Sequence, residues 1–268
     1  MKETKKKTGT WSKRFLMLAA AFVMIFVMKN TANAAGVQTV DMQQKNGVYV
    51  YTGIWEDYDT TVYHRITVPK SGVLFIGGTG ITSYGSRYGI YVTLYDSMSR
   101  ELGPYGKESV TADDLAEFRV KPGTYYIKVE GEKYYALSAG VYPCADRGGV
   151  SKKKATRIKQ NKAITGILPT NEKGSKADWF KFTVSKSKKL QLELAAYGDT
   201  GVIFYLYGPS YKKGQSLSQN NSADKYYSIN SLTRKKMKIK KGTYYIKVVR
   251  SYKGNGYSAN YQIKWKLK

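Results

Sequence analysis

The segment Val120-Lys-Pro-Gly-Thr-Tyr-Tyr-Ile-Lys-Val129 returns almost unchanged as Ile239-Lys-Lys-Gly-Thr-Tyr-Tyr-Ile-Lys-Val248. Eight of the ten positions are identical, and the two segments are 119 residues apart (239 − 120). A match of this length inside one chain indicates an internal repeat, and therefore two copies of one folding unit. The repeated residues are typical of a strand and the turn before it, and none of them is reactive. This stretch therefore predicts an architecture and leaves the ligand open.

Short segments with an apolar period of two residues surround the repeat. In residues 179–184, Phe180, Phe182 and Val184 share one side of an extended chain, and Lys181 lies on the other side. Half-buried antiparallel strands produce this alternation, and no long stretch has the 3.6-residue period of a helix. Many short strands separated by Gly, Asn, Ser and Lys indicate an all-β protein built as β-sandwiches.

The N-terminus has the three parts of a secretory signal peptide, which we place at residues 1–34. Six lysines and arginines precede an apolar run from Phe15 to Met28, and Ala32-Asn33-Ala34 supplies a small-x-small cleavage site. A helix of 14 residues (28 − 15 + 1) rises about 21 Å, which is too short for a hydrocarbon core of roughly 30 Å. We therefore expect cleavage rather than a retained anchor, and no transmembrane segment in the mature chain. The expected location is extracellular or associated with the cell wall of a Gram-positive bacterium.

The mature chain divides into two parts of very different charge. We expect one domain over residues 35–146 and a second over 147–268, with a short link at Arg147-Gly148-Gly149. The first part carries 10 Lys and Arg against 13 Asp and Glu, a balance of −3, and the second carries 28 against 5, a balance of +23. The single cysteine, Cys144, excludes an intrachain disulfide, so packing must stabilise both domains.

Three motifs in the second part resemble the bacterial pre-peptidase C-terminal (PPC) domain. They are Asp178-Trp-Phe-Lys-Phe-Thr-Val184, Gly242-Thr-Tyr-Tyr-Ile-Lys-Val248 and Tyr257-Ser-Ala-Asn-Tyr-Gln-Ile263, in the order of the family. The first part resembles the family less, because Tyr63-His64 stands where the second has Trp179-Phe180. The resemblance implies two tandem jelly-roll-like antiparallel sandwiches, a module that usually accompanies secreted enzymes. Related modules of clostridial collagenases bind collagen and calcium, whereas here we expect modules that stand without an attached peptidase domain.

Catalysis has few candidate residues in this chain. His64 and Cys144 are the only histidine and the only cysteine, and they could form a nucleophile–base dyad only if the fold brought them together. His64 aligns with the inward-facing Phe180, so we expect a packing role and no enzyme activity. A zinc site lacks the usual cluster of ligands. We expect no cofactor, although Glu56, Asp57 and Asp59 form an acidic segment where a loop could hold calcium or simply lie in solvent.

Two sets of residues are candidates for ligand binding. Tyr84, Tyr88 and Tyr91 lie in a glycine-rich stretch, where aromatic rings could contact a sugar or an extended peptide, or could simply pack on strands. Lysines fall on the polar side of their strands in the second part, and if those strands are neighbours they form one cationic face. Its expected members are Lys181, Lys238, Lys247, Lys264 and Lys266.

The charge of the second part favours a polyanion as the partner. A balance of +23 exceeds what solubility requires, and self-repulsion at that density is relieved by an anionic polymer. We therefore expect a secreted binding or adhesion protein that attaches to an anionic polymer of the cell wall or extracellular matrix. A dedicated nucleic-acid partner is disfavoured, because no nucleic-acid-binding fold is visible and the chain is exported. The alternative is a collagen- or carbohydrate-binding accessory module that uses exposed aromatics and serves a separate peptidase.

Overall fold

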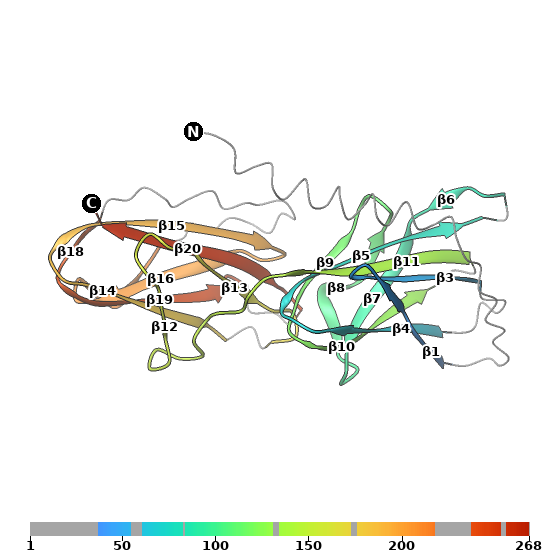
Figure 1. Cartoon of the computed structure of the whole chain (residues 1–268), viewed down its shortest axis with the longest axis horizontal. Helices are drawn as coiled ribbons and strands as arrows, with labels where there is room; N and C mark the ends of the chain where they lie inside the picture. The colour runs from blue at the N-terminus through green and yellow to red at the C-terminus, as the bar shows by residue number, and fades with distance from the viewer. Residues whose placement is uncertain are drawn as a thin grey trace.

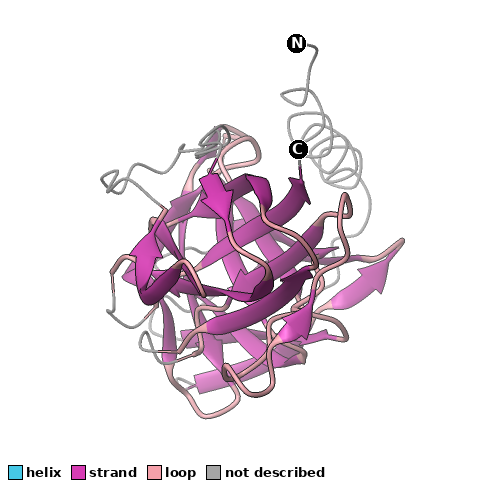
Figure 2. Ribbon diagram, turned by 90° about the vertical axis from the view of Figure 1, so that its left-hand side faces the viewer, coloured by secondary structure: helices cyan, strands magenta, loops and turns pink. Residues whose placement is uncertain are grey.

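The computed structural model describes residues 37–54, 61–82, 84–130, 134–172, 176–217, 237–252 and 256–267. Within these ranges the chain contains strands and no helix, as the alternating pattern predicted (Figures 1 and 2). The expected signal peptide and the acidic segment Glu56, Asp57 and Asp59 lie outside the described residues. No helix suitable for crossing a membrane occurs in the part of the chain that is described.

The N-terminal half forms two facing sheets. Sheet A has the strand order β1-β4-β10-β7-β8, and sheet B has the order β2-β3-β11-β5-β6, with β9 also paired to β5. The bounds are β1 Val37–Asp41, β2 Gln43–Lys45, β3 Val48–Ile54, β4 Thr61–Val68, β5 Gly72–Ile81, β6 Arg87–Tyr88, β7 Ile90–Asp96, β8 Glu101–Val110, β9 Ala116–Val120, β10 Gly123–Glu130 and β11 Tyr134–Pro143.

The C-terminal half repeats this arrangement. Sheet C has the order β12-β14-β19-β16-β17, and sheet D has the order β13-β20-β15-β18. The bounds are β12 Thr156–Arg157, β13 Ile164–Leu168, β14 Asp178–Val184, β15 Lys188–Gly198, β16 Val202–Gly208, β17 Tyr211–Ser216, β18 Met237–Ile239, β19 Gly242–Arg250 and β20 Ala259–Leu267.

Equivalent strands occupy equivalent places in the two halves. The repeated segment supplies β10 in the centre of sheet A and β19 in the centre of sheet C, and β4 and β14 are their neighbours. Sheet A and sheet C each begin with one parallel edge strand, β1 against β4 and β12 against β14, in otherwise antiparallel sheets. The internal repeat is therefore a repeat of topology, and the two parallel edges are a detail that the alternation pattern did not predict.

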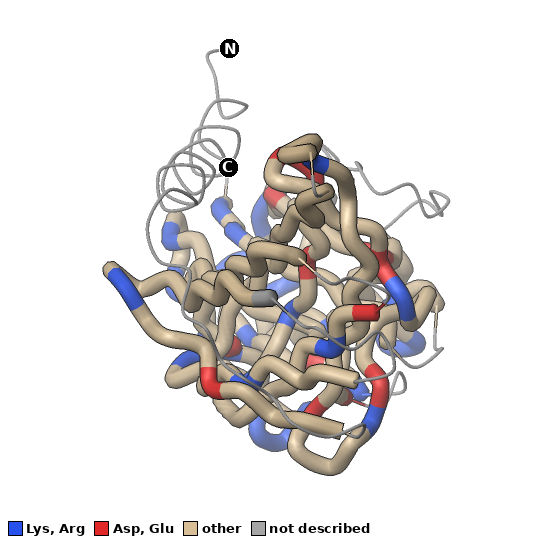
Figure 3. The backbone as a smooth tube through the Cα atoms, turned by 90° about the vertical axis from the view of Figure 1, so that its right-hand side faces the viewer, with Lys and Arg blue, Asp and Glu red and all other residues tan. Residues whose placement is uncertain are grey.

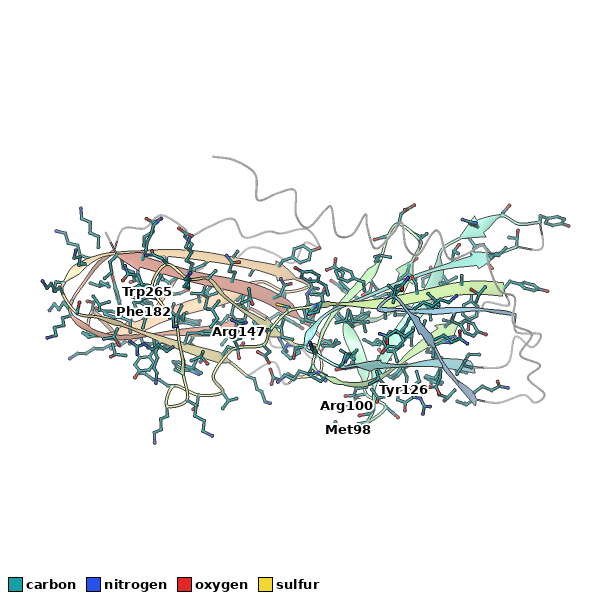
Figure 4. All side chains as sticks on the ribbon, viewed as in Figure 1. Met98, Arg100, Tyr126, Arg147, Phe182 and Trp265 are labelled. Carbon is teal, nitrogen blue, oxygen red and sulfur yellow. The ribbon has the colours of Figure 1, made fainter. Side chains whose placement is uncertain are left out.

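Each half has its own hydrophobic core between its two sheets. In the C-terminal half the ring of Phe182 stacks on Trp265 of the opposite sheet, with ring centroids 4.5 Å apart, and on Tyr244, at 5.6 Å (Figure 4). The Trp265 indole donates a hydrogen bond to the carbonyl oxygen of Ile158 at 3.1 Å, so its polar edge is satisfied although it is buried. The alternation read from residues 179–184 is thus confirmed, since Phe180, Phe182 and Val184 are buried.

The two sandwiches lie end to end and are joined by a packed junction (Figure 1). Arg119 of β9 is 1% exposed, and its guanidinium contacts Glu117 at 2.8 Å, Asn260 at 3.2 Å and Asp199 at 3.7 Å. Its carbonyl oxygen also accepts a hydrogen bond from the backbone of Thr170 at 2.8 Å. The expected link is part of this structure, because Gly149 forms two backbone hydrogen bonds with Trp179.

Candidate functional site

The predicted single lysine face is wrong. Lys181 and Lys247 lie on β14 and β19 of sheet C, whereas Lys238, Lys264 and Lys266 lie on β18 and β20 of sheet D. Because the two sheets face each other across the core, their polar sides point in opposite directions. Alternation along a strand predicted correctly that these side chains avoid the core, but it carries no information about which sheet a strand joins.

Two of the five lysines share an ion pair with one carboxylate of the protein. Lys264 lies 3.2 Å and Lys266 lies 3.3 Å from the carboxylate of Glu193 on the adjacent strand β15. Both lysines hold the pKa of Glu193 below its ordinary value, against a raising effect of burial. These two amines are therefore poorer candidates for an anionic ligand than amines that have no carboxylate nearby.

Six lysines gather instead at the free end of the C-terminal half, which we name the distal lysine cluster. Two connections cross from one sheet to the other at this end, the turn between β14 and β15 and the segment between β18 and β19. They lie side by side, because Val184 pairs with Gly242 in sheet C and Lys188 pairs with Ile239 in sheet D. Figure 4 shows nitrogen-tipped side chains projecting from this end. The cluster consists of Lys186, Lys188, Lys189, Lys238, Lys240 and Lys241, all exposed.

Hydrogen bonds fix the backbone beneath the distal lysine cluster. The buried Tyr244 donates its hydroxyl proton to the carbonyl oxygen of Lys240 at 3.0 Å, and Ser210 accepts a bond from the Lys240 backbone at 3.2 Å. Tyr244 and Ser210 are themselves 3.0 Å apart. The turn that carries Lys240 and Lys241 is thus held at Lys240, which lowers the ordering cost of a contact made through these two amines.

The equivalent turn of the N-terminal half already contacts carboxylates. Tyr125 donates to the carbonyl oxygen of Lys121 at 2.8 Å, as Tyr244 does to Lys240. That turn points into the junction, where the Lys121 amine lies 3.0 Å from Glu172 and 3.7 Å from Asp146. In the N-terminal half, therefore, the surface that this turn contacts is anionic.

The described acidic residues of the C-terminal half lie away from the distal lysine cluster. Glu172, Asp178 and Asp199 are at or near the junction, and Glu193 is bonded to Lys264 and Lys266. The N-terminal half, seen from its outer end, shows acidic and basic residues interspersed (Figure 3). Within the described ranges no ion pair involves a member of the distal lysine cluster.

The three candidate tyrosines do not form one loop cluster. Tyr84 lies at a hairpin tip and is 95% exposed, Tyr88 is in β6 against Gly80, and Tyr91 is in β7 beneath the Lys107 amine, 4.5 Å from its ring centre. They belong to a tip, to sheet B and to sheet A, and the idea of one glycine-rich loop is wrong. Ligand contact by any of the three stays a prediction.

The possible His64–Cys144 dyad is not formed. His64 is fully buried, with Nε2 2.6 Å from the hydroxyl of Tyr135, and burial lowers its pKa to about 3. Tyr135 lies near the start of β11, and Cys144 follows the end of that strand. The step of nine residues between them spans about 30 Å in an extended chain. Burial raises the pKa of the Cys144 thiol, the opposite of what an activated nucleophile needs. His64 has the packing role that its alignment with Phe180 predicted.

Metal coordination is not suggested by the described part of the chain. There, no three His, Cys, Asp or Glu side chains gather as a metal site would require. The calcium hypothesis for Glu56, Asp57 and Asp59 falls outside that part and stays a prediction.

One half-buried carboxyl at the junction was missed by the sequence reasoning. Burial raises the pKa of Asp178 to about 7, while the Tyr261 hydroxyl, which donates to it at 2.5 Å, lowers that pKa in part. In the sequence, Asp178 was noted only as the first residue of the predicted strand 178–184. Nothing in the sequence indicated that this end of the strand would be covered by the other half.

Comparison with known proteins supports the expected family for the C-terminal half. Residues 176–250 match the model of the bacterial pre-peptidase C-terminal domain. None of the curated proteins matches the chain by sequence. This match lies within the C-terminal half, so a second domain of this family in the N-terminal half stays a prediction even though the strand order is shared.

The similar solved structures are distant in sequence. The CUB1-EGF-CUB2 segment of human MASP-1/3 is 10% identical, covering 83% of this chain and 100% of that one at a TM-score of 0.24. The CBM22 tandem of Paenibacillus barcinonensis Xyn10C is 9% identical, with coverages of 76% and 82% and a TM-score of 0.24. Tripeptidyl peptidase 2 is 10% identical, with coverages of 85% and 24% and a TM-score of 0.28. Scores of this size carry no argument about ligands. What the comparisons do show is that residues 176–250 of this chain match the bacterial pre-peptidase C-terminal domain.

Proposed function

We propose that this chain is a secreted, non-catalytic binding protein that attaches to an anionic polymer of the cell wall or extracellular matrix. The observation that carries the proposal is the distal lysine cluster, six exposed lysines from two neighbouring connections with no ion pair among the described residues. The junction supports it, because the equivalent Lys121 turn is held by carboxylates. The mechanism is electrostatic: encounter is fast, specificity is modest, and affinity falls steeply with salt.

Charge reversal at the cluster tests the proposal. Each lysine near an anionic surface contributes about 1 kcal/mol, so a Lys188→Glu, Lys240→Glu, Lys241→Glu variant should bind purified wall teichoic acid or heparin at least about a hundredfold more weakly. Binding of the unaltered chain should vanish by about 0.5 M salt. Affinity is measured by titration of the full secreted chain between 50 mM and 500 mM salt.

A matched variant separates local from overall charge. Lys70→Glu, Arg87→Glu and Lys162→Glu change the net charge by the same amount at exposed positions outside the distal lysine cluster. This control should keep most of the affinity. Equal losses in the two variants, or a reversed cluster that still binds at low salt, would refute the role of the cluster.

A further inference from the structure

The outer side of sheet C carries a second arrangement of cations, and these are interleaved with aromatic rings. Strand register places Lys247 between Trp179 and Tyr205, and places Tyr245 between Lys181 and Tyr207. Lys152, from the segment before β12, lies over two of these rings. We name this surface the aromatic–lysine face, which consists of Trp179, Tyr205, Tyr207, Tyr245, Lys152, Lys181 and Lys247.

The rings of this face are directed outward and are partly accessible. The Lys152 amine lies 5.0 Å from the ring centre of Tyr245 and 5.4 Å from that of Tyr207, and the Lys247 amine lies 5.7 Å from the centre of Trp179. Trp179 and Tyr207 meet above the central strand with centroids 5.6 Å apart. All four aromatic residues are half-buried, and flexible lysine side chains lie over Trp179, Tyr207 and Tyr245.

Sheet A has a similar pattern of rings and cations, except that Thr93 pairs with Lys128 where Tyr205 pairs with Lys247. Lys128 pairs with Tyr63, and Tyr126 lies between Arg65 and Tyr95, as Tyr245 lies between Lys181 and Tyr207. Tyr63 and Tyr95 have centroids 5.7 Å apart, close to the spacing of Trp179 and Tyr207. The N-terminal half is therefore an internal reference for the aromatic–lysine face.

The two faces differ where sheet A has carboxylates. Asp41, which pairs in register with Arg65, bonds its guanidinium at 2.5 Å, and Glu130 bonds the Lys128 amine at 2.5 Å. The corresponding positions of sheet C are Arg157, which pairs with Lys181, and Val249, which is 119 residues after Glu130. Sheet C thus keeps the rings and cations and lacks both neutralising acids.

We propose that the aromatic–lysine face binds an acidic polysaccharide, with rings of the sugar over the aromatic side chains and its anionic groups on Lys181 and Lys247. Charge complementarity carries the choice of an anion, since no described carboxylate bonds these two lysines. The rings call for a ligand with flat apolar patches. Hydroxyl groups border them, because Thr183 and Thr243 expose theirs 3.4 Å apart, which suits a hydroxylated partner.

Single-stranded nucleic acid is the competing class, because it also combines phosphates with rings that stack. A base covers a whole aromatic face, whereas a sugar covers part of one, and the rings here are half-buried. The geometry therefore favours the polysaccharide, and an oligonucleotide serves as one arm of the test.

The experiment titrates hyaluronan, a carboxylated polysaccharide, into the full secreted chain at low salt. Tyr245→Leu removes a stacking ring and should weaken binding about tenfold, whereas Tyr245→Phe should stay within about twofold. Val249→Glu rebuilds the acid of sheet A beside Lys247 and should also weaken binding about tenfold. Tyr126→Leu on sheet A is the matched control and should leave the affinity unchanged.

Polyphosphate, which has charge but no rings, separates this face from the distal lysine cluster. Tyr245→Leu and Val249→Glu should bind polyphosphate normally. The triple charge reversal of the distal lysine cluster should weaken binding of both hyaluronan and polyphosphate. Failure of one proposal can therefore be told from failure of the other. A thermal unfolding midpoint near that of the unaltered chain confirms that each variant is folded. Equal losses in Tyr245→Leu and Tyr126→Leu, or no loss in Tyr245→Leu, would overturn the inference. Tighter binding of a single-stranded oligonucleotide than of hyaluronan, lost in Tyr245→Leu, would replace the polysaccharide with nucleic acid.

Discussion

His64 and Phe180 show how one position of the repeat accepts two very different side chains. Each occupies the same inward place, opposite Ile127 and Ile246 of the central strands. His64 keeps one ring nitrogen bonded to Tyr135, while its Nδ1 has no partner in the described structure. A neutral imidazole can be buried in this way, but an imidazolium would be a costly unpaired charge.

Protonation of His64 should destabilise the protein in acid. Its folded pKa is about 3 and its unfolded value about 6.5, so between these pH values only the unfolded chain binds the proton. From pH 7 to pH 3 this residue should lower the free energy of unfolding by about 4 kcal/mol. His64→Phe should remove that dependence, which urea unfolding across the pH range will show. An unchanged pH profile in the variant would contradict the buried neutral state.

Asp178 should act in the opposite sense. Its folded pKa of about 7 exceeds its unfolded value of 3.8, so the folded state holds the proton between these pH values. Stability from this residue is fully present below pH 4 and is lost as pH rises to 7, by up to about 4 kcal/mol. Asp178→Asn should abolish this loss in the same unfolding series, and Asp113→Asn, at an exposed site, should not. Parallel curves for Asp178→Asn and the unaltered chain would show that the carboxyl is already ionised.

At the scale of strands, the sequence predicted well which side of a strand each side chain occupies. It predicted poorly which strands are neighbours in a sheet. The period of two correctly placed Lys181, Lys247 and Lys264 on outer sides. It could not show that Lys264 belongs to the opposite sheet, because sheet membership is set by pairing between residues far apart in the chain. The internal repeat offered a partial remedy, since aligned segments proved to be structurally equivalent strands.

The aromatic stack across the C-terminal core should be a main source of its stability. Phe182→Ala removes the ring that contacts both Trp265 and Tyr244, and should lower the free energy of unfolding by about 3–5 kcal/mol. Thr183→Ala, at the next position and exposed, should change it by less than about 0.5 kcal/mol. Chemical denaturation of both variants makes the comparison. Similar small effects would mean that the core closes around the missing ring.

At the scale of the whole molecule, the junction was the least predictable feature. Alternation and charge balance do not indicate that Arg119 meets Asp199 and Asn260 from the other half. The sequence suggested a glycine link there, and glycine is indeed required, since a Cβ on Gly149 would lie 2.1 Å from the carbonyl oxygen of Lys154. The requirement comes from close packing between segments rather than from freedom of the backbone.

Arg119 should couple the unfolding of the two sandwiches. Arg119→Met leaves Glu117 and Asp199 without their shared cation, and loss of a buried partner costs about 3–5 kcal/mol. We expect one calorimetric transition in the unaltered chain and two in this variant. Arg65→Met breaks an exposed pair with Asp41 and should cost less than about 1 kcal/mol. A single transition in Arg119→Met would show that the remaining junction contacts suffice.

The end-to-end arrangement also sets how far the protein can reach. The distal lysine cluster and the hairpin bearing Tyr84 lie at opposite extremes of the long axis (Figure 1). A molecule anchored by its lysines would stand upright, with that hairpin at the greatest height above the polymer. A flexible link between the two sandwiches would let this hairpin move relative to the anchored end. The buried guanidinium of Arg119 at the junction opposes such a movement.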